Sequence, residues 1–118
     1  MIRVGIGYDV HQLQEGELLS IGGICIPSNV GSVGHSDGDA LSHAIVDALL
    51  GAVGLGDIGN IFPSDDDTWK DVNSTIFLKD VVGRVKKFRF NINNIDATII
   101  LQEPKVEKYI DKIRENLA

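Results

Sequence analysis

Apolar residues recur along the chain with two different periods, one typical of strands and one typical of helices. From about Ile2 to Val10, branched apolar residues alternate with glycine, which predicts a strand. The apolar run Ile92–Leu101 predicts a second, buried strand. Between residues 18 and 26, two short apolar runs flank Gly22-Gly23, and a pair of glycines in this position predicts the two-residue turn of a β-hairpin.

Other segments have the spacing of amphipathic helices. The first is expected to begin at Ser36, which forms a capping-box pattern with Asp39, and to continue to about Val53. Asn73 or Ser74 is expected to cap a second helix that runs to about Lys87. A third is predicted over residues 106–117. The apolar stripe expected to be buried on the first helix comprises Leu41, Ala44, Ile45, Ala48, Leu49 and Ala52.

The order of these elements describes one structural unit. It predicts a single α+β domain over residues 1–118, in which helices cover a mixed β-sheet and a small β-hairpin is attached. The last predicted helix reaches the end of the sequence without a capping residue, so we expect the domain to be C-terminally incomplete.

Charge and cysteine content restrict the classes of partner. The 118 residues carry 17 acidic and 11 basic side chains, and the net charge of −6 disfavours binding to nucleic acid or to anionic membranes. The one cysteine, Cys25, is expected to be a packed thiol and fits a reducing compartment. The start at Met1 lacks a signal-peptide pattern, and no apolar run is long enough to span a bilayer. We therefore expect a cytoplasmic protein.

The residues best suited to chemistry are a carboxylate and two imidazoles. Asp9 and His11 are two positions apart, so on a strand they point to the same face and can bind one ion. His43 lies on the predicted helix between Asp39 and Asp47, either of which can orient its ring. A lone helical histidine is more often an ordinary solvated residue, but together the three ligands form a pattern typical of catalytic zinc.

Several motifs occur in an order that is similar to the 2-C-methyl-D-erythritol 2,4-cyclodiphosphate synthase family of the non-mevalonate isoprenoid pathway. They are Gly7-Tyr8-Asp9-Val10-His11, residues 35–39, Gly56-Asp57-Ile58-Gly59, Phe62-Pro63 and Gln102-x-Pro104-Lys105. The resemblance implies a homotrimer with active sites between subunits and zinc on Asp9, His11 and His43. It also implies a lyase that converts 4-diphosphocytidyl-2-C-methyl-D-erythritol 2-phosphate to the cyclic diphosphate and releases CMP.

The resemblance further implies the residues that contact substrate. His35 is expected to stabilise the transition state, and residues 101–107 are expected to enclose the cytosine. The full set of expected substrate contacts is Asp9, His11, His35, Ser36, Asp57, Ile58, Gly59, Phe62, Pro63, Ser64, Asp65, Asp66, Leu101, Gln102, Glu103, Pro104, Lys105, Val106 and Glu107.

The sequence departs from the family pattern in two places. The family continues into a strand with a Thr-Thr-x-Glu motif, whose glutamate helps to hold a second divalent cation, Mg²⁺ or Mn²⁺, and this motif is absent from the sequence. Leu101 occupies a position where the family commonly has a small residue. Two alternatives stay open: a metal-dependent phosphoesterase, and a zinc-stabilised oligomer that binds a cytidine nucleotide without turnover.

Overall fold

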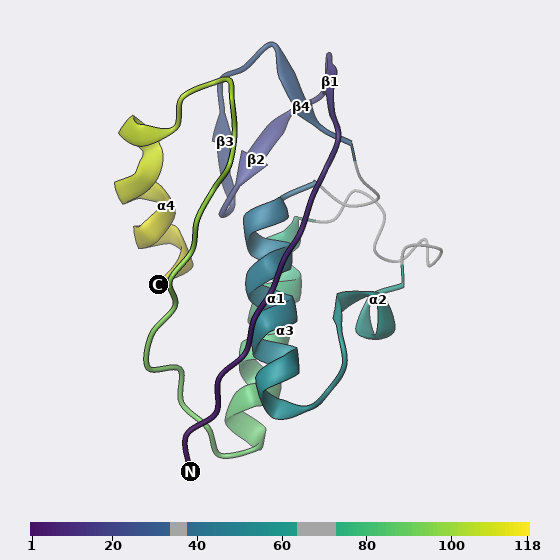
Figure 1. The fold of residues 1–118 in the computed structure, drawn as a ribbon, viewed down its shortest axis with the longest axis vertical. Helices are drawn as coiled ribbons and strands as arrows, with labels where there is room; N and C mark the ends of the chain where they lie inside the picture. The colour runs from purple at the N-terminus through teal and green to yellow at the C-terminus, as the bar shows by residue number, and fades with distance from the viewer. Residues whose placement is uncertain (34–37, 64–72) are drawn as a thin grey trace.

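Two helices that lie side by side, α1 (Ala40–Val53) and α3 (Ser74–Lys87), form the centre of the computed structural model (Figure 1). The structure describes residues 1–33, 38–63 and 73–118. At one end of the helix pair lie the short strands β1 (Leu13–Glu15), β2 (Leu19–Ile21), β3 (Ile24–Ile26) and β4 (Val30–Ser32). The remaining elements are the one-turn helix α2 (Ile58–Ile61), the 3₁₀ turn η2 (Glu107–Tyr109) and helix α4 (Ile110–Leu117).

Apolar residues from these elements form two clusters of buried side chains. The larger cluster joins α1 to α3, because both helices direct branched or aromatic residues toward each other. Its buried members are Ile45, Val46, Leu50, Phe62, Phe77, Leu78, Val81 and Val85. The smaller cluster packs Ile113 of α4 against Leu19, Ile21 and Ile26 of the hairpin. The larger cluster therefore fixes α1 and α3 against each other.

The predicted hairpin is confirmed. Strands β2 and β3 pair in an antiparallel register that places Ile21 opposite Ile24. Gly22 and Gly23 form the turn with φ of 60° and 80°, a left-handed conformation that glycine adopts without a steric penalty. Cys25 is exposed, so the expectation of a packed thiol is wrong. It points outward because alternate residues of the short strand β3 face opposite sides.

Strands β1 and β4 also pair in an antiparallel arrangement, with Leu13 opposite Ser32. The sequence did not predict either strand, because each has only three residues and together they carry polar residues and a glycine. Both strand pairs in the described ranges are antiparallel, so these residues do not form the mixed sheet that was expected. The α+β composition itself is as predicted.

The two segments predicted as long strands are extended but unpaired. Within the parts of the chain that the structure describes, residues 2–10 and 92–101 take part in no strand pairing. Most of their side chains are exposed, with Val4 at 89% and Ile100 at 92% of full exposure, so the prediction of a buried strand over 92–101 is wrong. In Figure 1 residues 2–10 cross in front of α1, and residues 92–101 run between α1 and α4. The alternating pattern was present, but strand pairing also needs a partner.

Helix α1 begins at Ala40, four residues after the predicted start, and Asp39 is its N-cap. The carboxylate of Asp39 accepts a hydrogen bond from the backbone N–H of Ser42, so the capping box based on Ser36 is wrong. Of the predicted buried stripe only Ile45 is buried; Ser42, Val46 and Leu50 are the other buried residues of the helix. The residues of α1 that are buried are mainly those that face α3, so the packing of α3 determines the buried side of the helix.

The second helix is confirmed, since Asn73 caps α3 through the backbone N–H of Thr75. The predicted third helix is present as the turn η2 followed by α4. Across the described ranges, the helices are all too short or too polar to cross a membrane.

Candidate metal centre

The carboxylate and the two imidazoles singled out in the sequence converge in the structure. One ligand atom from each of Asp9, His11 and His43 can be chosen so that all lie within 4.8 Å of one another. Nδ1 of His11 lies 2.8 Å from Oδ2 of Asp9, and Nδ1 of His43 lies 3.5 Å from the same oxygen. The side chains of Asp9, His11 and His43 are 23%, 15% and 12% exposed, so the cluster is shielded but reachable from solvent.

Two parts of the chain build this cluster. Asp9 and His11 lie on the extended N-terminal segment, which runs closely over α1: a Cβ placed on Gly7 would be 1.7 Å from the carbonyl oxygen of Ala44. His43 lies in the first turn of α1, and its backbone N–H bonds to the carbonyl of Asp39. The close backbone approach allowed by glycine therefore brings the first two ligands to the third.

The Asp9 carboxylate has the electrostatics of a metal ligand. Burial acts to raise its pKa, but interactions with His11 and His43 outweigh burial and lower the pKa from 3.8 to about 2. Its Oδ2 atom is buried and, among the described residues, accepts no hydrogen bond of acceptable geometry despite the nearby imidazoles. A buried anionic oxygen facing two imidazole nitrogens suits a divalent cation. The three residues thus fit the predicted metal site.

His43 is held from its other side by α3. Its Nε2 atom lies 2.7 Å from Oγ of Ser74, which is fully buried. The ring centroid of Phe77, one turn further along α3, is 6.2 Å from that of His43. The sequence alone did not reveal the role of Ser74, because a serine at the start of a helix is usually explained by capping.

Asp39 is buried and joins the start of α1 to the hairpin turn. Its two carboxylate oxygens accept hydrogen bonds from the backbone N–H groups of Gly22 and Gly23, at 2.9 and 2.7 Å. They also accept bonds from the backbone N–H and the hydroxyl of Ser42. Asp39 therefore fixes the helical turn that carries His43.

Asp47, predicted as a candidate to orient His43, instead holds the next loop. Its Oδ1 atom accepts a 2.7 Å hydrogen bond from the backbone N–H of Ile58. Burial, followed by the negative charges of Asp57 and Asp9, raises the pKa of Asp47, although the bond from Ile58 opposes this. Asp57 caps α2 by accepting a hydrogen bond from the N–H of Asn60. Asp47 thus ties the predicted substrate contacts at 57–59 to α1.

Of the expected substrate contacts in residues 35–36 and 62–66, the structure describes only Phe62 and Pro63. Phe62 is buried and stacks on Phe77 with 4.4 Å between ring centroids, while Pro63 follows it. His35 and Ser36, and Ser64, Asp65 and Asp66, lie outside the described residues. Their substrate roles, like the others, stay predictions.

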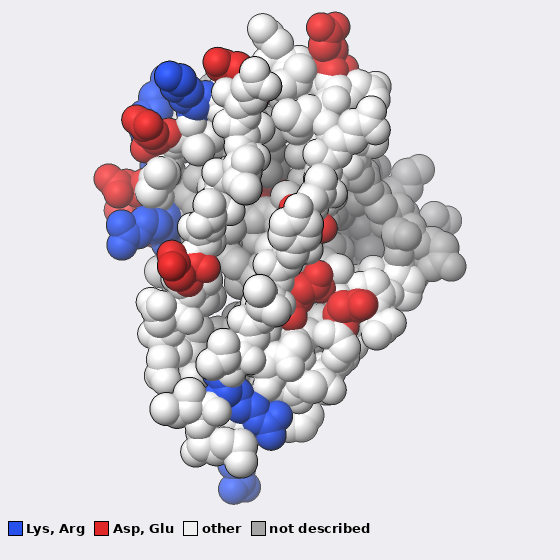
Figure 2. Space-filling model, viewed as in Figure 1, with Lys and Arg blue, Asp and Glu red and all other residues white. Residues whose placement is uncertain are grey.

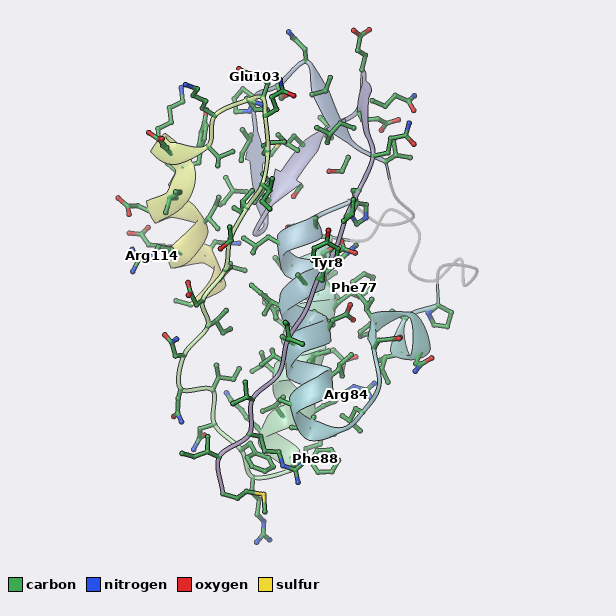
Figure 3. All side chains as sticks on the ribbon, in the orientation of Figure 1. Tyr8, Phe77, Arg84, Phe88, Glu103 and Arg114 are labelled. Carbon is green, nitrogen blue, oxygen red and sulfur yellow. The ribbon has the colours of Figure 1, made fainter. Side chains whose placement is uncertain are left out.

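Glu103, in the segment 101–107, lies away from the metal cluster. Figure 3 shows Glu103 beside the strand pairs, far from Tyr8, the neighbour of Asp9, and from Phe77. Glu103 and Pro104 line an open cleft together with residues 27–30. The structure therefore does not bring the expected cytosine-binding segment to the metal cluster within one chain.

The fold and the cluster together define an α+β protein with a candidate Asp-His-His metal centre on a helix and an adjoining extended segment. The sequence model of the YgbB family matches residues 2–118. The chain belongs to this family, and the predicted family membership is confirmed.

Relatives and solved structures agree with this assignment. The chain is 51% identical over 118 residues to the 2-C-methyl-D-erythritol 2,4-cyclodiphosphate synthase of Fusobacterium nucleatum, and the match covers 100% of this chain and 74% of that one. A bifunctional IspDF from Campylobacter jejuni superimposes with a TM-score of 0.94 at 38% identity, covering 99% of this chain and 32% of that one. An IspF of Plasmodium falciparum in complex with CDP gives a TM-score of 0.81 at 38% identity, covering 98% and 70%.

Proposed function

We propose that the protein is a metal-dependent lyase that converts 4-diphosphocytidyl-2-C-methyl-D-erythritol 2-phosphate to 2-C-methyl-D-erythritol 2,4-cyclodiphosphate and releases CMP, in isoprenoid precursor biosynthesis. The convergence of Asp9, His11 and His43 carries the proposal, because it provides a metal centre in a chain half identical to a relative named for that product. We also propose a cytoplasmic location for this reaction.

Asp9, His11 and His43 would hold zinc, since one carboxylate and two imidazoles leave a position of the ion open to substrate. When bound, such an ion screens phosphate charge and polarises a phosphoryl oxygen. In the proposed reaction the 2-phosphate attacks the β-phosphorus of the same molecule and CMP leaves, so the protein need supply no nucleophile. Its residues bind the two phosphates and hold them in line.

The nucleotide part of the substrate is assigned to residues 101–107, with the erythritol part at Asp57 to Gly59. The Plasmodium falciparum IspF forms a complex with CDP, which supports a cytidine nucleotide as ligand. We assign the second cation, Mg²⁺ or Mn²⁺, to the substrate diphosphate. The metal cluster lies near the middle of the molecule and Glu103 lies beside the strand pairs, which supports an active site shared between copies.

A homotrimer would supply that arrangement. The N-terminal segment exposes a row of apolar side chains, and uncharged residues cover much of it in the space-filling view (Figure 2). Such a row is unusual on the surface of a monomer and is typical of an interface. Its members are Ile2, Val4, Ile6, Tyr8 and Val10.

Turnover by the full-length protein tests the proposal. With substrate, zinc and magnesium, we expect CMP release together with the phosphorus NMR signals of a cyclic diphosphate. Replacing Asp9 or His43 with Ala should reduce the rate by at least about a hundredfold, because loss of a metal ligand removes the ion. Asp111→Ala, which removes an exposed carboxylate of α4, is the matched control and should keep full activity.

The same assay separates the alternatives. Open monophosphate products would indicate a phosphoesterase, and CDP binding by calorimetry without turnover would indicate a nucleotide-binding oligomer. Full activity in the Asp9→Ala and His43→Ala variants would contradict the proposal.

A further inference from the structure

We propose that Ser74 is a positioning residue that fixes the tautomer and orientation of His43. In this arrangement the Nε2–H group of His43 donates a hydrogen bond to Oγ of Ser74, and Nδ1 presents its lone pair to the cation. The inference rests on the proposed metal site and goes beyond it, since it assigns a role to a residue that does not bind the ion.

The two ring nitrogens of His43 face different partners. Nε2 lies 2.7 Å from Oγ of Ser74, while Nδ1 lies 3.5 Å from the Asp9 carboxylate. A neutral imidazole carries a proton on one nitrogen and a lone pair on the other, so a hydrogen bond at one nitrogen decides what the other can do. A donor role for Nε2 leaves Nδ1 free of a proton, on the side of Asp9 and His11.

Ser74 is held in place by its own surroundings. It is the first residue of α3 and is fully buried, so its hydroxyl has little freedom to move. The Asn73 side chain accepts hydrogen bonds from both the backbone N–H and the hydroxyl of Thr75, which fixes the start of the helix. Phe77, in the next turn, packs beside the His43 ring. The end of α3 therefore provides a rigid support for this imidazole.

If Ser74 is the donor in this hydrogen bond, His43 cannot bind the cation through Nδ1. If the Ser74 hydroxyl donated to Nε2, the ring proton would sit on Nδ1 and point toward Asp9. Nδ1 would then have no lone pair for a cation. The two arrangements have the same heavy-atom positions, so a measurement of the tautomer distinguishes them.

Nitrogen NMR of the zinc-loaded protein, labelled with ¹⁵N-histidine and held at fixed pH, shows which ring nitrogen of His43 keeps its proton. We expect the Nε2–H form of His43 in the wild type and a mixture of forms in Ser74→Ala. Titration with zinc alone, against a chromophoric chelator, should show about tenfold or greater loss of affinity in Ser74→Ala. Ser74→Thr keeps the hydroxyl and should bind zinc more tightly than Ser74→Ala does.

Thr75→Ala is the matched control, because it removes a hydroxyl from the same helical turn that bonds to Asn73. It should keep the wild-type tautomer and zinc affinity. Unchanged tautomer and zinc affinity in Ser74→Ala, or the Nδ1–H form in the wild type, would overturn the inference. If Ser74→Ala does not fold by circular dichroism, Ser74→Cys keeps the shape with a weaker hydrogen-bonding group, and wild-type zinc affinity in that variant would also overturn it.

These outcomes are distinct from failure of the proposed function. Wild-type protein that has the expected tautomer and binds zinc through it, but releases no CMP, would contradict the lyase and support the role of Ser74. If the wild type releases CMP but Ser74→Ala binds zinc as tightly as the wild type, the lyase is supported and the role of Ser74 is contradicted.

Discussion

The two sides of the candidate metal centre are built in different ways. On the helix side, His43 lies between the buried cap Asp39 and the buried Ser74, and hydrogen bonds hold each of these contacts. On the other side, Asp9 and His11 belong to an extended segment whose residues 2–10 are mostly exposed and have no strand partner in the described ranges. One side is thus fixed by hydrogen bonds to buried residues, and the other depends on packing against α1.

This difference suggests where the centre is strong and where it is sensitive. Loss of a buried hydrogen-bond acceptor on the helix side should cost the most stability, because several donors lose their partner at once. Changes in the N-terminal segment should cost less stability but displace two ligands together. Substitutions on each side of the centre, and binding of the ion that would connect the two sides, test this difference in stability and sensitivity.

Asp39→Ala should have the largest effect. It removes the cap of α1 and leaves the buried N–H of Gly22 and the part-buried N–H of Gly23 without their acceptor. We expect a loss of about 3–5 kcal/mol in the free energy of unfolding, measured by urea denaturation. The control Asn73→Ala removes the cap of α3, which serves one exposed backbone N–H, and should cost about 1 kcal/mol. Equal losses in the two variants would contradict the central role of Asp39.

Zinc should join the two sides and stabilise the protein. At a free zinc concentration a hundred times the dissociation constant, we expect about 2.7 kcal/mol of added stability, because only the folded state brings the three ligands together. Thermal unfolding with zinc and then with a chelator measures the gain and its reversal. His43→Ala should abolish the gain, whereas Asp111→Ala should keep it. A zinc-induced gain that survives His43→Ala would place the ion elsewhere.

The sequence predicted the locally determined parts of the fold well. Gly22-Gly23 marked the hairpin, and Asn73 marked the start of α3, because a turn or a cap depends on a few neighbouring residues. The start of α1 was misplaced because Asp39 was taken as the third residue of a capping box, whereas it is the N-cap itself and accepts the N–H of Ser42. Its bonds to Gly22 and Gly23, which are 17 and 16 residues away, add a tertiary contact to this cap. A capping-box pattern relates only residues three positions apart, so it cannot predict a hydrogen bond between residues distant in sequence.

The ligands of the candidate site were predicted, but their supports were not. Asp9, His11 and His43 were chosen by residue type, spacing and resemblance, and the structure brings them together. Ser74 and Asp39 act through tertiary contacts, which neither periodicity nor a motif encodes. The strands predicted over residues 2–10 and 92–101 are also unpaired in the described ranges, since apolar alternation shows that a strand is possible and does not identify its partner.

Gly7→Ala tests the weaker side. The added Cβ would be 1.7 Å from the carbonyl oxygen of Ala44, so the N-terminal segment must move away from α1. We expect a loss of about 1–3 kcal/mol in stability and a clear loss of zinc affinity, measured by denaturation and chelator competition. Gly51→Ala is the control, because Gly51 is helical, exposed and has nothing within 4 Å of an added Cβ. It should gain about 0.5–1 kcal/mol. Wild-type zinc affinity in Gly7→Ala would show that the segment does not depend on this approach.

The smallest expected effect is a change in the pH dependence of stability when Asp47 is replaced. Burial and the charges of Asp57 and Asp9 raise its pKa in the folded state above 3.8, so its contribution to stability is greatest below that value and falls as pH rises through the raised pKa. Asp9, whose pKa is lowered to about 2, acts in the opposite direction and loses its contribution as pH falls from 3.8 toward 2. A comparison of Asp47→Asn with wild type cancels the Asp9 effect, provided that Asp9 titrates alike in both proteins.

Asn keeps an oxygen that can accept the hydrogen bond from Ile58 but carries no charge. Metal-free Asp47→Asn should therefore be as stable as the wild type or slightly more stable at pH 7, and this advantage should disappear at pH 3, where the wild-type carboxyl is protonated. Urea denaturation of both proteins at the two pH values measures the difference, and Asp111→Asn, at an exposed position of α4, is the control. A variant that is less stable than wild type at pH 7 and more stable at pH 3 would reverse the sign, and would mean that the negative charge of Asp47 supports the loop rather than strains it.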